Sequence, residues 1–214
     1  VSIGKNQNPN DTVYVENCRK IGVDIVRRNS GGGTVFHDQA GELTYSVTAQ
    51  TSDLGKDSIA VYTGIYAAVT DALRLLGIPA DYNAGDQKNC PNLTVDNRKI
   101  SGSAQTVKRN VAQQHGTLLL NVDLSLMFQL LRVPFTDDSG VAAQTAQRKI
   151  TSVQTELGHA VSPETAVNAL TQGFKAALRI NLNPAALTLY EQAMAQKLYN
   201  NKYATDGWNQ TGKS

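Results

Sequence analysis

Charge, aromatic side chains and cysteine are all scarce in this sequence. Only 18% of its 214 residues are charged and 6% are aromatic, against 41% that are hydrophobic, and there are 2 cysteines. This composition excludes a collagen, a disordered tail and a small domain held together by disulfides. It fits one globular domain over residues 1–214, long enough to bury most of its apolar surface.

The charges are nearly balanced, with 20 Lys and Arg against 18 Asp and Glu, which gives a net charge of +2. Binding of nucleic acid normally needs a basic face, so we expect no nucleic-acid partner. The longest apolar stretches, Thr117–Leu120 and Leu126–Val133, are too short to cross a bilayer, and we expect no membrane association.

The first residues, Val1–Lys5, do not form a signal peptide and include no initiator Met, so we expect a fragment or a processed product. Cys18 and Cys90 fit no metal-binding spacing, and we interpret them as reduced thiols of a cytoplasmic protein. The three histidines, at positions 37, 115 and 159, match no zinc motif either.

Strand patterns predominate in the first part of the chain. Alternating apolar residues predict strands over Ile21–Val26 and Leu43–Thr48. Further strands are expected over Leu93–Val95, Lys99–Gln105 and His115–Leu120, the first two joined by a turn at Asp96 and Asn97.

Helix patterns predominate later. Asp57 or Ser58 begins a helix that runs to Leu76, and a second is expected over Asp123–Leu131. Ser162 and Pro163 start a third, whose predicted buried face consists of Val167, Leu170, Phe174 and Leu178, and Asn183–Pro184 start a fourth that runs through Leu198. Strands that cluster early and helices that cluster late predict an α+β fold.

A run of three glycines, Gly31–Gly33, follows the basic pair Arg27–Arg28. Glycines let a backbone approach a ligand closely, and an arginine can hold a carboxylate or phosphate through two hydrogen bonds. The spacing matches neither a Walker loop nor a dinucleotide-binding turn. The alternative is a plain tight turn with solvated arginines, but three glycines would be unfavourable there, so a ligand-binding loop is favoured.

Three further positions are candidates for chemistry. Lys99 precedes a strand of small residues and offers one compact positive charge to an anion, although an isolated lysine is more often merely solvated. His115 precedes an apolar strand, where a structural role is the common one. Cys90 lies in a polar loop and would act as a nucleophile only with a base nearby.

Taken together and in this order, these segments resemble the lipoate–protein ligase family and its biotin ligase and octanoyltransferase relatives. Residues 27–38 (RRNSGGGTVFHD) are similar to the family signature. Arg98–Gln105 and His115–Leu119 resemble its second and third conserved blocks, and the resemblance extends over nearly the whole chain.

The resemblance implies a mixed β-sheet with flanking helices, as in biotinyl protein ligases and class II aminoacyl-tRNA synthetases. It implies that the enzyme joins lipoate and ATP into lipoyl-AMP, with Mg²⁺, and passes the lipoyl group to a lysine of a lipoyl-domain protein. Such acceptors are the acyltransferase subunits of 2-oxoacid dehydrogenases and the glycine cleavage H protein. Lys99 would be catalytic, and Arg28 would pair with phosphate. The other residues expected to bind ATP or lipoyl-AMP are Ser30, Gly31, Gly32, Gly33, Thr34, Val35, Phe36, His37, Gly102, Ser103 and His115.

The chain departs from the family pattern at three places. Relative to the family pattern, we expect the strand and helix that usually precede the first block to be absent, and a C-terminal accessory domain to be supplied by a separate partner protein. Many ligases have an acidic residue before the lysine block, and here Asn92 would stand in as a metal ligand. Two alternatives stay open: an octanoyltransferase that uses octanoyl-acyl carrier protein with Cys90 as its nucleophile, and an inactive acyl-binding remnant.

Overall fold

The computed structural model describes residues 1–86 and 90–213, and its α+β class agrees with the sequence prediction. In chain order the elements are β1 (Ser2–Ile3), α1 (Pro9–Thr12), α2 (Val15–Ile21), β2 (Val26–Arg27), β3 (Glu42–Gln50), α3 (Thr51–Leu54), α4 (Ser58–Leu75), β4 (Asp81–Asn83), β5 (Asn92–Val95), β6 (Arg98–Lys108), β7 (Val111–Leu119), α5 (Leu124–Leu130), α6 (Ser139–Ala146), α7 (Val153–Leu157), α8 (Pro163–Leu178), α9 (Leu189–Leu198), η1 (Tyr199–Tyr203) and η2 (Gly207–Thr211). No helix among the described residues is long and apolar enough to cross a membrane.

The chain forms two compact units. Unit 1 comprises residues 1–37, 125–142 and 183–214, and unit 2 comprises residues 38–124 and 143–182. Each unit has its own hydrophobic core.

Unit 2 is built on a five-stranded sheet with the order β3-β7-β6-β5-β4, in which every neighbouring pair is antiparallel. Tight turns with positive φ join its central strands, at Asp96 and Asn97 (48° and 62°) and at Arg109 and Asn110 (51° and 61°). The first turn confirms the prediction. The second turn was not predicted. As a result, the predicted strand began at His115, four residues after β7 actually begins.

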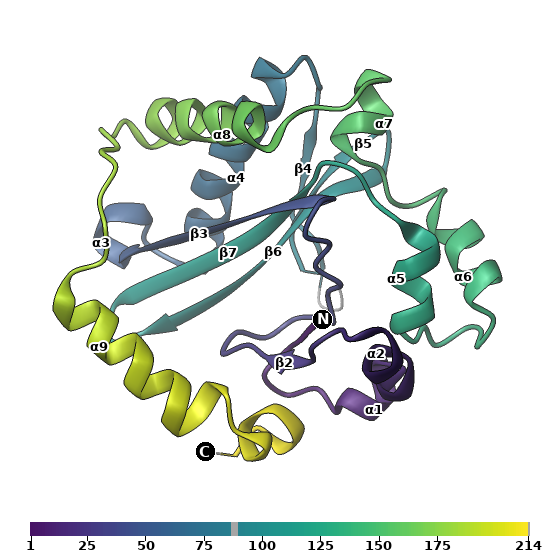
Figure 1. The fold of residues 1–214 in the computed structure, drawn as a ribbon. Coiled ribbons are helices and arrows are strands. Elements are labelled where there is room, and N and C mark those ends of the chain that lie inside the picture. Colours follow the sequence, from purple (N-terminus) through teal and green to yellow (C-terminus); the bar gives the residue numbers. More distant parts are fainter. Residues whose placement is uncertain (87–89, 214) are drawn as a thin grey trace. The chain divides into compact units, whose positions relative to one another are not determined.

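Helices α4 and α8 lie side by side and cover one face of this sheet (Figure 1). Asp57 caps α4 by accepting a hydrogen bond from the Ala60 amide, and Gly77, with a φ of 86°, ends it, both as predicted. Ile65, Val69 and Leu73 of α4 are fully buried against the sheet.

The contact between α4 and α8 depends on small residues. Ser162 caps α8 with Pro163 in its first turn, as predicted, but the predicted buried position Val167 is 45% exposed. Ala166, Ala169 and Gly173 face the core instead. Leu170 and Phe174 are buried as predicted and Leu178 packs against the core, but the prediction missed the small residues that let the two helices approach closely.

Unit 1 has a separate core of buried apolar residues around the parallel pair β1 and β2. Here the strand predicted over Ile21–Val26 is wrong: α2 includes Ile21 and ends at Gly22, whose φ of 73° terminates it, and only Val26 and Arg27 form a strand. Val23 and Ile25 alternate because both pack against this core from an irregular segment.

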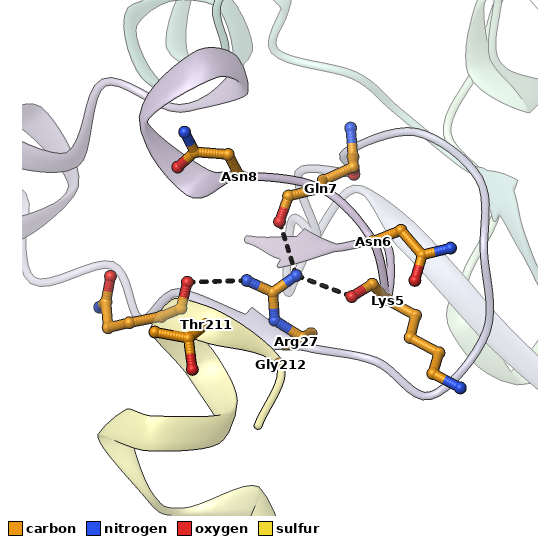
Figure 2. Close-up of a pocket in the computed structure, with 8 residues that line it drawn as sticks. Lys5, Asn6, Gln7, Asn8, Arg27, Thr211 and Gly212 are labelled. Carbon is orange, nitrogen blue, oxygen red and sulfur yellow. Dashed lines mark hydrogen bonds between the residues drawn. The ribbon is translucent and has the colours of Figure 1, made fainter. Parts of the chain in front are cut away.

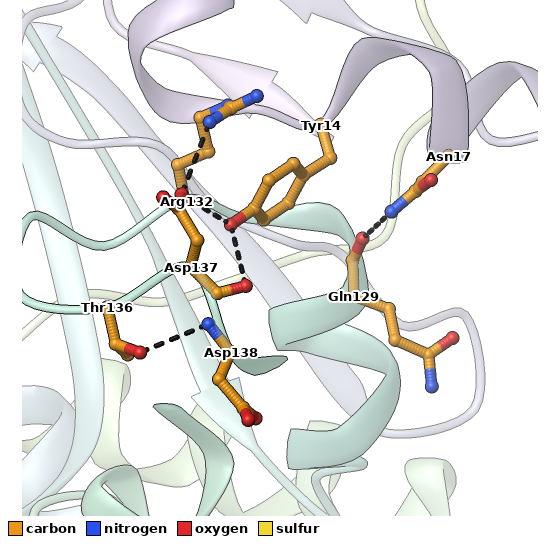
Figure 3. A network of polar contacts seen from close by, with 7 residues as sticks. All are labelled: Tyr14, Asn17, Gln129, Arg132, Thr136, Asp137 and Asp138. Carbon is orange, nitrogen blue, oxygen red and sulfur yellow. Dashed lines mark hydrogen bonds and ion pairs between the residues drawn. The ribbon is translucent and has the colours of Figure 1, made fainter. Parts of the chain in front are cut away.

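A polar network ties the start of α2 to the segment after α5 (Figure 3). The Tyr14 hydroxyl donates to the Asp137 carboxylate at 3.1 Å, and the Arg132 guanidinium lies 4.2 Å from the Tyr14 ring centre. Arg132 also approaches Asp137 at 3.4 Å. These side chains are largely exposed, so the network contributes little stability and mainly fixes the local geometry.

The C-terminal segment of unit 1 differs from its prediction. The expected helix from Asn183 begins only at Leu189, because Thr188 and Glu191 form a reciprocal capping box there. Trp208 is 2% exposed and its indole donates to the Arg27 carbonyl at 2.8 Å. Trp208 therefore anchors the C-terminal segment to β2.

Two helical glycines should respond oppositely to alanine. A Cβ at Gly173 would lie 2.2 Å from the Ala68 carbonyl oxygen, a backbone atom, whereas a Cβ at Gly64 would meet nothing closer than 3.8 Å. We expect Gly173→Ala to lower the free energy of unfolding by about 1–3 kcal/mol. Gly64→Ala should raise it by about 0.5–1 kcal/mol through helix propensity. Equal effects in denaturant titrations of the two variants would contradict this packing of α4 on α8.

Candidate functional site

The candidate residues fall into two groups, one in each unit. Lys99, Gly102, Ser103 and His115 belong to β6 and β7 of unit 2, with Cys90 and Asn92 just before and at the start of β5. The glycine segment and its neighbours, residues 28–37, belong to unit 1. Each group is built by its own local contacts.

A β-bulge sets the direction of Lys99. Leu93 pairs with Ser101, but the next residue of β5, Thr94, pairs with Lys99, so β6 carries one extra residue at this point. Ile100 and Ser101 are consequently both buried. In a regular strand residues two apart share a face, and Lys99 would then point to the same side as Ser101, toward the helices. The extra residue turns Lys99 to the opposite face.

On that face the Lys99 side chain lies over Gly102. A Cβ at Gly102 would be 2.6 Å from both Cε and Nζ of Lys99, so only glycine leaves room for the ammonium group there. The residue keeps exposed surface, yet protein atoms crowd its ammonium enough that desolvation lowers its pKa below the ordinary 10.5, an effect that the Cys90 thiol opposes.

The electrostatic influence of Cys90 places its thiol near the same site. Cys90 is exposed, and it affects both Lys99 and Tyr62, whose pKa is raised to about 12 by burial first and then by Cys90 and Tyr82. The exposed thiol therefore lies within electrostatic range of the Lys99 ammonium.

The strand register gives Lys99 its neighbours. Asn92, Gly102 and Thr117 form one row across β5, β6 and β7, and Ala104 and His115 form the next row on the same face. The expectation that Ser103 joins them is wrong. Ser103 shares a row with Gly116 and its hydroxyl accepts from the buried Gln114 amide at 3.2 Å, on the helix-covered face.

Sequence reasoning gave no role to Gly116 and Thr117, which follow His115. Thr117 lies in the row of Gly102, whereas Gly116 lies with Ser103 on the helix-covered face and serves packing. A Cβ at Gly116 would lie 2.5 Å from the Tyr45 hydroxyl and 2.8 Å from the Gly102 carbonyl oxygen, so this glycine lets β3 and β6 close around β7. Burial raises the pKa of Tyr45, which stays a neutral hydroxyl beneath the sheet. The signal for Gly116 in the sequence is a glycine inside an otherwise apolar strand, which often marks the close approach of another backbone.

In unit 1 the glycine segment is held from both sides. The Ser30 carbonyl accepts from the Lys5 amide at 2.9 Å, and Val35 pairs with Ser2 through two backbone hydrogen bonds, both shorter than 3.0 Å. Phe36 is buried in the core of unit 1. Gly32 has a φ of 89°, which only glycine adopts without strain. The segment is therefore a fixed loop, not a turn between two regular strands.

Thr34 and His37 are also anchored. The Thr34 hydroxyl donates to the Gln7 side chain at 3.1 Å, and the same Gln7 oxygen accepts from the Gly4 amide at 2.7 Å. The His37 ring nitrogen Nε2 lies 2.7 Å from the Ser2 hydroxyl. These partners come from the N-terminal residues, which the sequence analysis did not connect with the site.

The two arginines before the loop have different surroundings. Arg27 is 4% exposed, and all its side-chain nitrogens donate to backbone carbonyls, of Gly4, Lys5, Gln7, Trp208, Asn209 and Gln210. Figure 2 shows the hydrogen bonds to the carbonyls of Lys5 and Gln7. It lines a polar pocket of about 400 Å³ but has no free donor to offer a ligand there. Arg27 thus has a structural role, because its hydrogen bonds hold the N-terminal and C-terminal segments together.

Arg28 points to the loop itself. Its Nη2 donates to the Gly31 carbonyl at 2.7 Å and to the Gly33 carbonyl at 2.6 Å, and its Nη1 donates to the Ser2 carbonyl at 3.2 Å. From the sequence, Arg28 was expected to contact phosphate. A phosphate would have to share these nitrogens with the carbonyl groups that they already contact. The phosphate contact stays a prediction.

A protein site for Mg²⁺ does not emerge from the residues present. Within residues 1–86 and 90–213 no three His, Cys, Asp or Glu side chains gather where they could hold a metal ion. The Asn92 amide nitrogen donates to the Cys90 carbonyl at 3.2 Å, which leaves one amide oxygen as a ligand. Mg²⁺ prefers carboxylates and phosphates, so the metal role of Asn92 is not supported by this donor set.

One family of known proteins matches a part of the chain that includes both groups of candidate residues. The sequence model of the lipoyl protein ligase A/B catalytic domain matches residues 1–175. The chain belongs to this family. Octanoyltransferase LipM of Symbiobacterium thermophilum is 34% identical over 98% of the chain and 82% of its own length. Lipoate-protein ligase A subunit 1 of Thermoplasma acidophilum is 28% identical over 98% of the chain and 80% of its own length.

Solved structures agree with the family assignment. A crystal structure of lipoate-protein ligase A bound with ATP has a TM-score of 0.86 and 27% identity over 98% of the chain and 81% of that structure. A bi-partite lipoate protein ligase with its E2 lipoyl domain, from Thermoplasma acidophilum, has a TM-score of 0.85 and 28% identity over 98% of the chain and 79% of that structure. The chain is therefore an enzyme of lipoyl or octanoyl group transfer with the family fold.

Replacing Gly102 should separate catalysis from folding. The Cβ in Gly102→Ala would meet only the flexible end of Lys99, so we expect the melting temperature to stay near that of the wild type. The displaced ammonium should lower kcat by about 100-fold, as misplacement of a catalytic group does. Thermal unfolding and acyl-transfer assays on the same preparations test both parts.

Gly116→Ala is the matched comparison in the neighbouring strand. Its Cβ would meet the backbone of Gly102 and the enclosed Tyr45 ring, so we expect a loss of about 1–3 kcal/mol in the free energy of unfolding. If Gly102→Ala were the less stable of the two, or kept full activity, the placement of Lys99 over Gly102 would be wrong.

The lowered pKa of Lys99 predicts a decline in activity at alkaline pH. Its charged form is lost as pH rises through a value below 10.5, so the rate should fall there, earlier than for an ordinary lysine. Lys99→Arg keeps its charge and should move this fall to higher pH whatever its absolute rate. Cys90→Ser removes the group that raises the pKa of Lys99 and should move the fall to lower pH. Superimposable profiles for wild type and Lys99→Arg would rule out Lys99 as the titrating group.

Proposed function

We propose that this chain is a lipoate–protein ligase that activates lipoate with ATP and transfers the lipoyl group to a lysine of a lipoyl domain. The observation that carries the proposal is the Lys99 ammonium, turned by the β-bulge onto the face of the sheet opposite to α4 and α8 and seated over Gly102. A fixed, partly desolvated positive charge is what a reaction with anionic transition states requires.

In the first step, a carboxylate oxygen of lipoate attacks the α-phosphorus of ATP. The new oxygen–phosphorus bond forms as the bond to the β-phosphate breaks, and pyrophosphate leaves with the electron pair. The Lys99 ammonium would hold the charge that gathers on the α-phosphate and the carboxylate. This role needs no titration of Lys99, only its presence as a cation.

In the second step, the neutral ε-amine of the acceptor lysine attacks the acyl carbon. The carbonyl oxygen becomes negative, AMP leaves with the electron pair of the broken bond, and the amine loses its proton to solvent. Lys99 would again stabilise the negative oxygen, and no covalent enzyme intermediate is formed. The fixed glycine segment would supply backbone contacts to the acyl adenylate.

Relatives support the ligase in two ways. One relative is a lipoate-protein ligase subunit, and the similar solved structures include lipoate ligases with ATP and with lipoic acid. One of these ligases is bi-partite and was solved together with its E2 lipoyl domain. We accordingly propose a lipoyl-domain acceptor, a separate accessory protein for full adenylation, and action in the cytoplasm.

A cysteine-dependent octanoyltransferase is the second candidate, and the position of Cys90 favours it. Its thiol lies within electrostatic range of Lys99, and several relatives are octanoyltransferases, at 31% to 34% identity. The Cys90 sulfur would attack the thioester of octanoyl-acyl carrier protein, release the carrier thiol, and hold the octanoyl group. The acceptor amine would then form the amide and release Cys90.

One assay with two variants separates the candidates. The full chain is incubated with a lipoyl domain and either lipoate with ATP and Mg²⁺ or octanoyl-acyl carrier protein alone, and the acceptor is weighed by mass spectrometry. For the ligase we expect ATP-dependent acylation with pyrophosphate release, kept by Cys90→Ser and lowered about 100-fold or more by Lys99→Ala. Acylation without ATP that Cys90→Ser abolishes would replace the ligase by the octanoyltransferase. No acylation in either arm, with the accessory protein added, would leave the acyl-binding remnant.

A further inference from the structure

The backbone of Lys99 is held by a segment that comes later in the chain. The ladder between β6 and β7 begins only at Ser101, so β7 does not pair with Lys99. The segment after α6 lies there instead: the Lys99 amide donates to the Lys149 carbonyl at 2.8 Å, and the Lys99 carbonyl accepts from the Thr151 amide at 2.9 Å. The result is a parallel bridge between Lys99 and Ile150, which satisfies both backbone groups of Lys99.

Three side chains hold this segment against β6. Glu156, in α7, accepts a hydrogen bond from the Arg98 guanidinium at 2.9 Å through its Oε1 atom. The same oxygen accepts a hydrogen bond from the Thr151 hydroxyl. Arg98 directly precedes Lys99, and Thr151 directly follows the bridging residue Ile150. The Glu156 carboxylate therefore connects the two bridged segments right beside the bridge.

The protein partly encloses this cluster. The side chain of Glu156 is 12% exposed and that of Arg98 is 30% exposed, and Thr151 is 1% exposed. Solvent therefore screens this ion pair less than it screens a pair on the surface. The first turn of α7 is fixed as well, because the Ser152 hydroxyl accepts a hydrogen bond from the Thr155 amide. Glu156 is thus presented by a capped helix that begins directly after the bridge.

The bulge in β6 explains why Lys99 needs this support. A bulge interrupts the regular ladder and leaves the extra residue, here Ile100, without a partner in β5. Without the bridge to Ile150, the Lys99 amide and carbonyl would lose their protein partners, and the bulged strand would be free to shift. The bridge therefore stabilises the conformation that turns Lys99 toward Gly102.

We propose that Arg98, Thr151 and Glu156 are positioning residues for Lys99. They hold the segment after α6 in place, the bridge then fixes the Lys99 backbone, and the fixed backbone keeps the ammonium over Gly102. In this role all three act through the Lys99 backbone and not through contact with a substrate. A misplacement of ~1 Å can cost about 100-fold in rate, so even a small shift of the bridge matters. The catalytic role of Lys99 rests on the proposed function.

Two substitutions of Thr151 give the sharpest test. Thr151→Val removes the hydroxyl and keeps a branched side chain in a buried place. We expect its kcat for acyl transfer to fall about tenfold while KM for the acceptor changes less than about twofold. Thr151→Ser keeps the hydroxyl and loses only a methyl group, so its kcat should stay within about twofold of the wild type. Equal kcat values for the two variants would overturn the role of the hydroxyl.

The ion pair is tested with a matched control. Arg98 contacts Glu156 through one nitrogen, Nη2, so the ammonium in Arg98→Lys can replace it. We expect Arg98→Lys to stay close to the wild type and Arg98→Met to lose about tenfold in kcat. Asp71→Ala is the control, because it breaks the ion pair with Arg74 in α4 of the same unit and should leave kcat unchanged. Equal losses in Asp71→Ala and Arg98→Met would contradict the proposal.

Hydrogen exchange tests the bridge without catalysis. The amides of Lys99 and Thr151 are the two donors of the bridge, and NMR follows their exchange in the full chain. We expect both to exchange about tenfold faster in Thr151→Val, because the local opening becomes easier. The Leu118 amide lies in a strand paired on both sides and should keep its protection. Unchanged exchange at the bridge, or equal acceleration at Leu118, would overturn the proposal.

The outcomes are separable from those of the proposed reaction. The kcat comparison uses whichever acyl donor the wild type accepts. Faster exchange at Lys99 in Thr151→Val, together with no acyl transfer by the wild type, would retain the support of the Lys99 backbone and reject the proposed ligase. Acyl transfer by Thr151→Val at the kcat of the wild type would retain the reaction and reject the positioning role.

Discussion

One extra residue in β6 decides what this enzyme can do with its lysine. If Leu93 and Ser101 were followed by a regular ladder, Lys99 would face the helix-covered core, where an ammonium group is strongly disfavoured. The bulge instead buries Ile100 and Ser101 together and turns Lys99 to the face opposite to the helices, over Gly102, which has no side chain. The position of the charge, its lowered pKa and its closeness to Cys90 all depend on this local change of register.

The glycine segment is fixed by contacts to its carbonyl groups and not by a change of strand register. Its shape is fixed because Arg28 and Lys5 donate to its carbonyl groups and Gly4 lies against the Gly32 carbonyl oxygen. Arg27 supports this arrangement indirectly, since its guanidinium gathers the carbonyls of the N-terminal and C-terminal segments into one buried cluster. Both arginines therefore serve the backbone. Positive charge and peptide dipoles are prepared before any substrate arrives, which is how catalysis by electrostatic stabilisation avoids reorganisation.

Much of the secondary structure was predictable because its signals are local. The cap at Asp57, the turn at Asp96 and Asn97, the stop at Gly77 and the cap at Ser162 each depend on neighbouring residues and appear as expected. The predictions were wrong where contacts between residues far apart in the sequence determine the local structure. Val23 and Ile25 alternate like a strand but pack irregularly on a core, and Val167 gave way to small residues because α8 has to approach α4 closely.

The sequence alone identified the glycine segment, Lys99 and the family, since the order and types of these residues are carried directly by the chain. It did not reveal that Ser103 points away from Lys99, or that Arg28 holds carbonyls. Those outcomes depend on which face a residue takes after a bulge and on which partners the N-terminal residues bring to the loop. The face of the sheet that a side chain takes, and the residues that it contacts, depend on pairing between segments that are remote in the sequence. Only the tertiary structure determines that pairing.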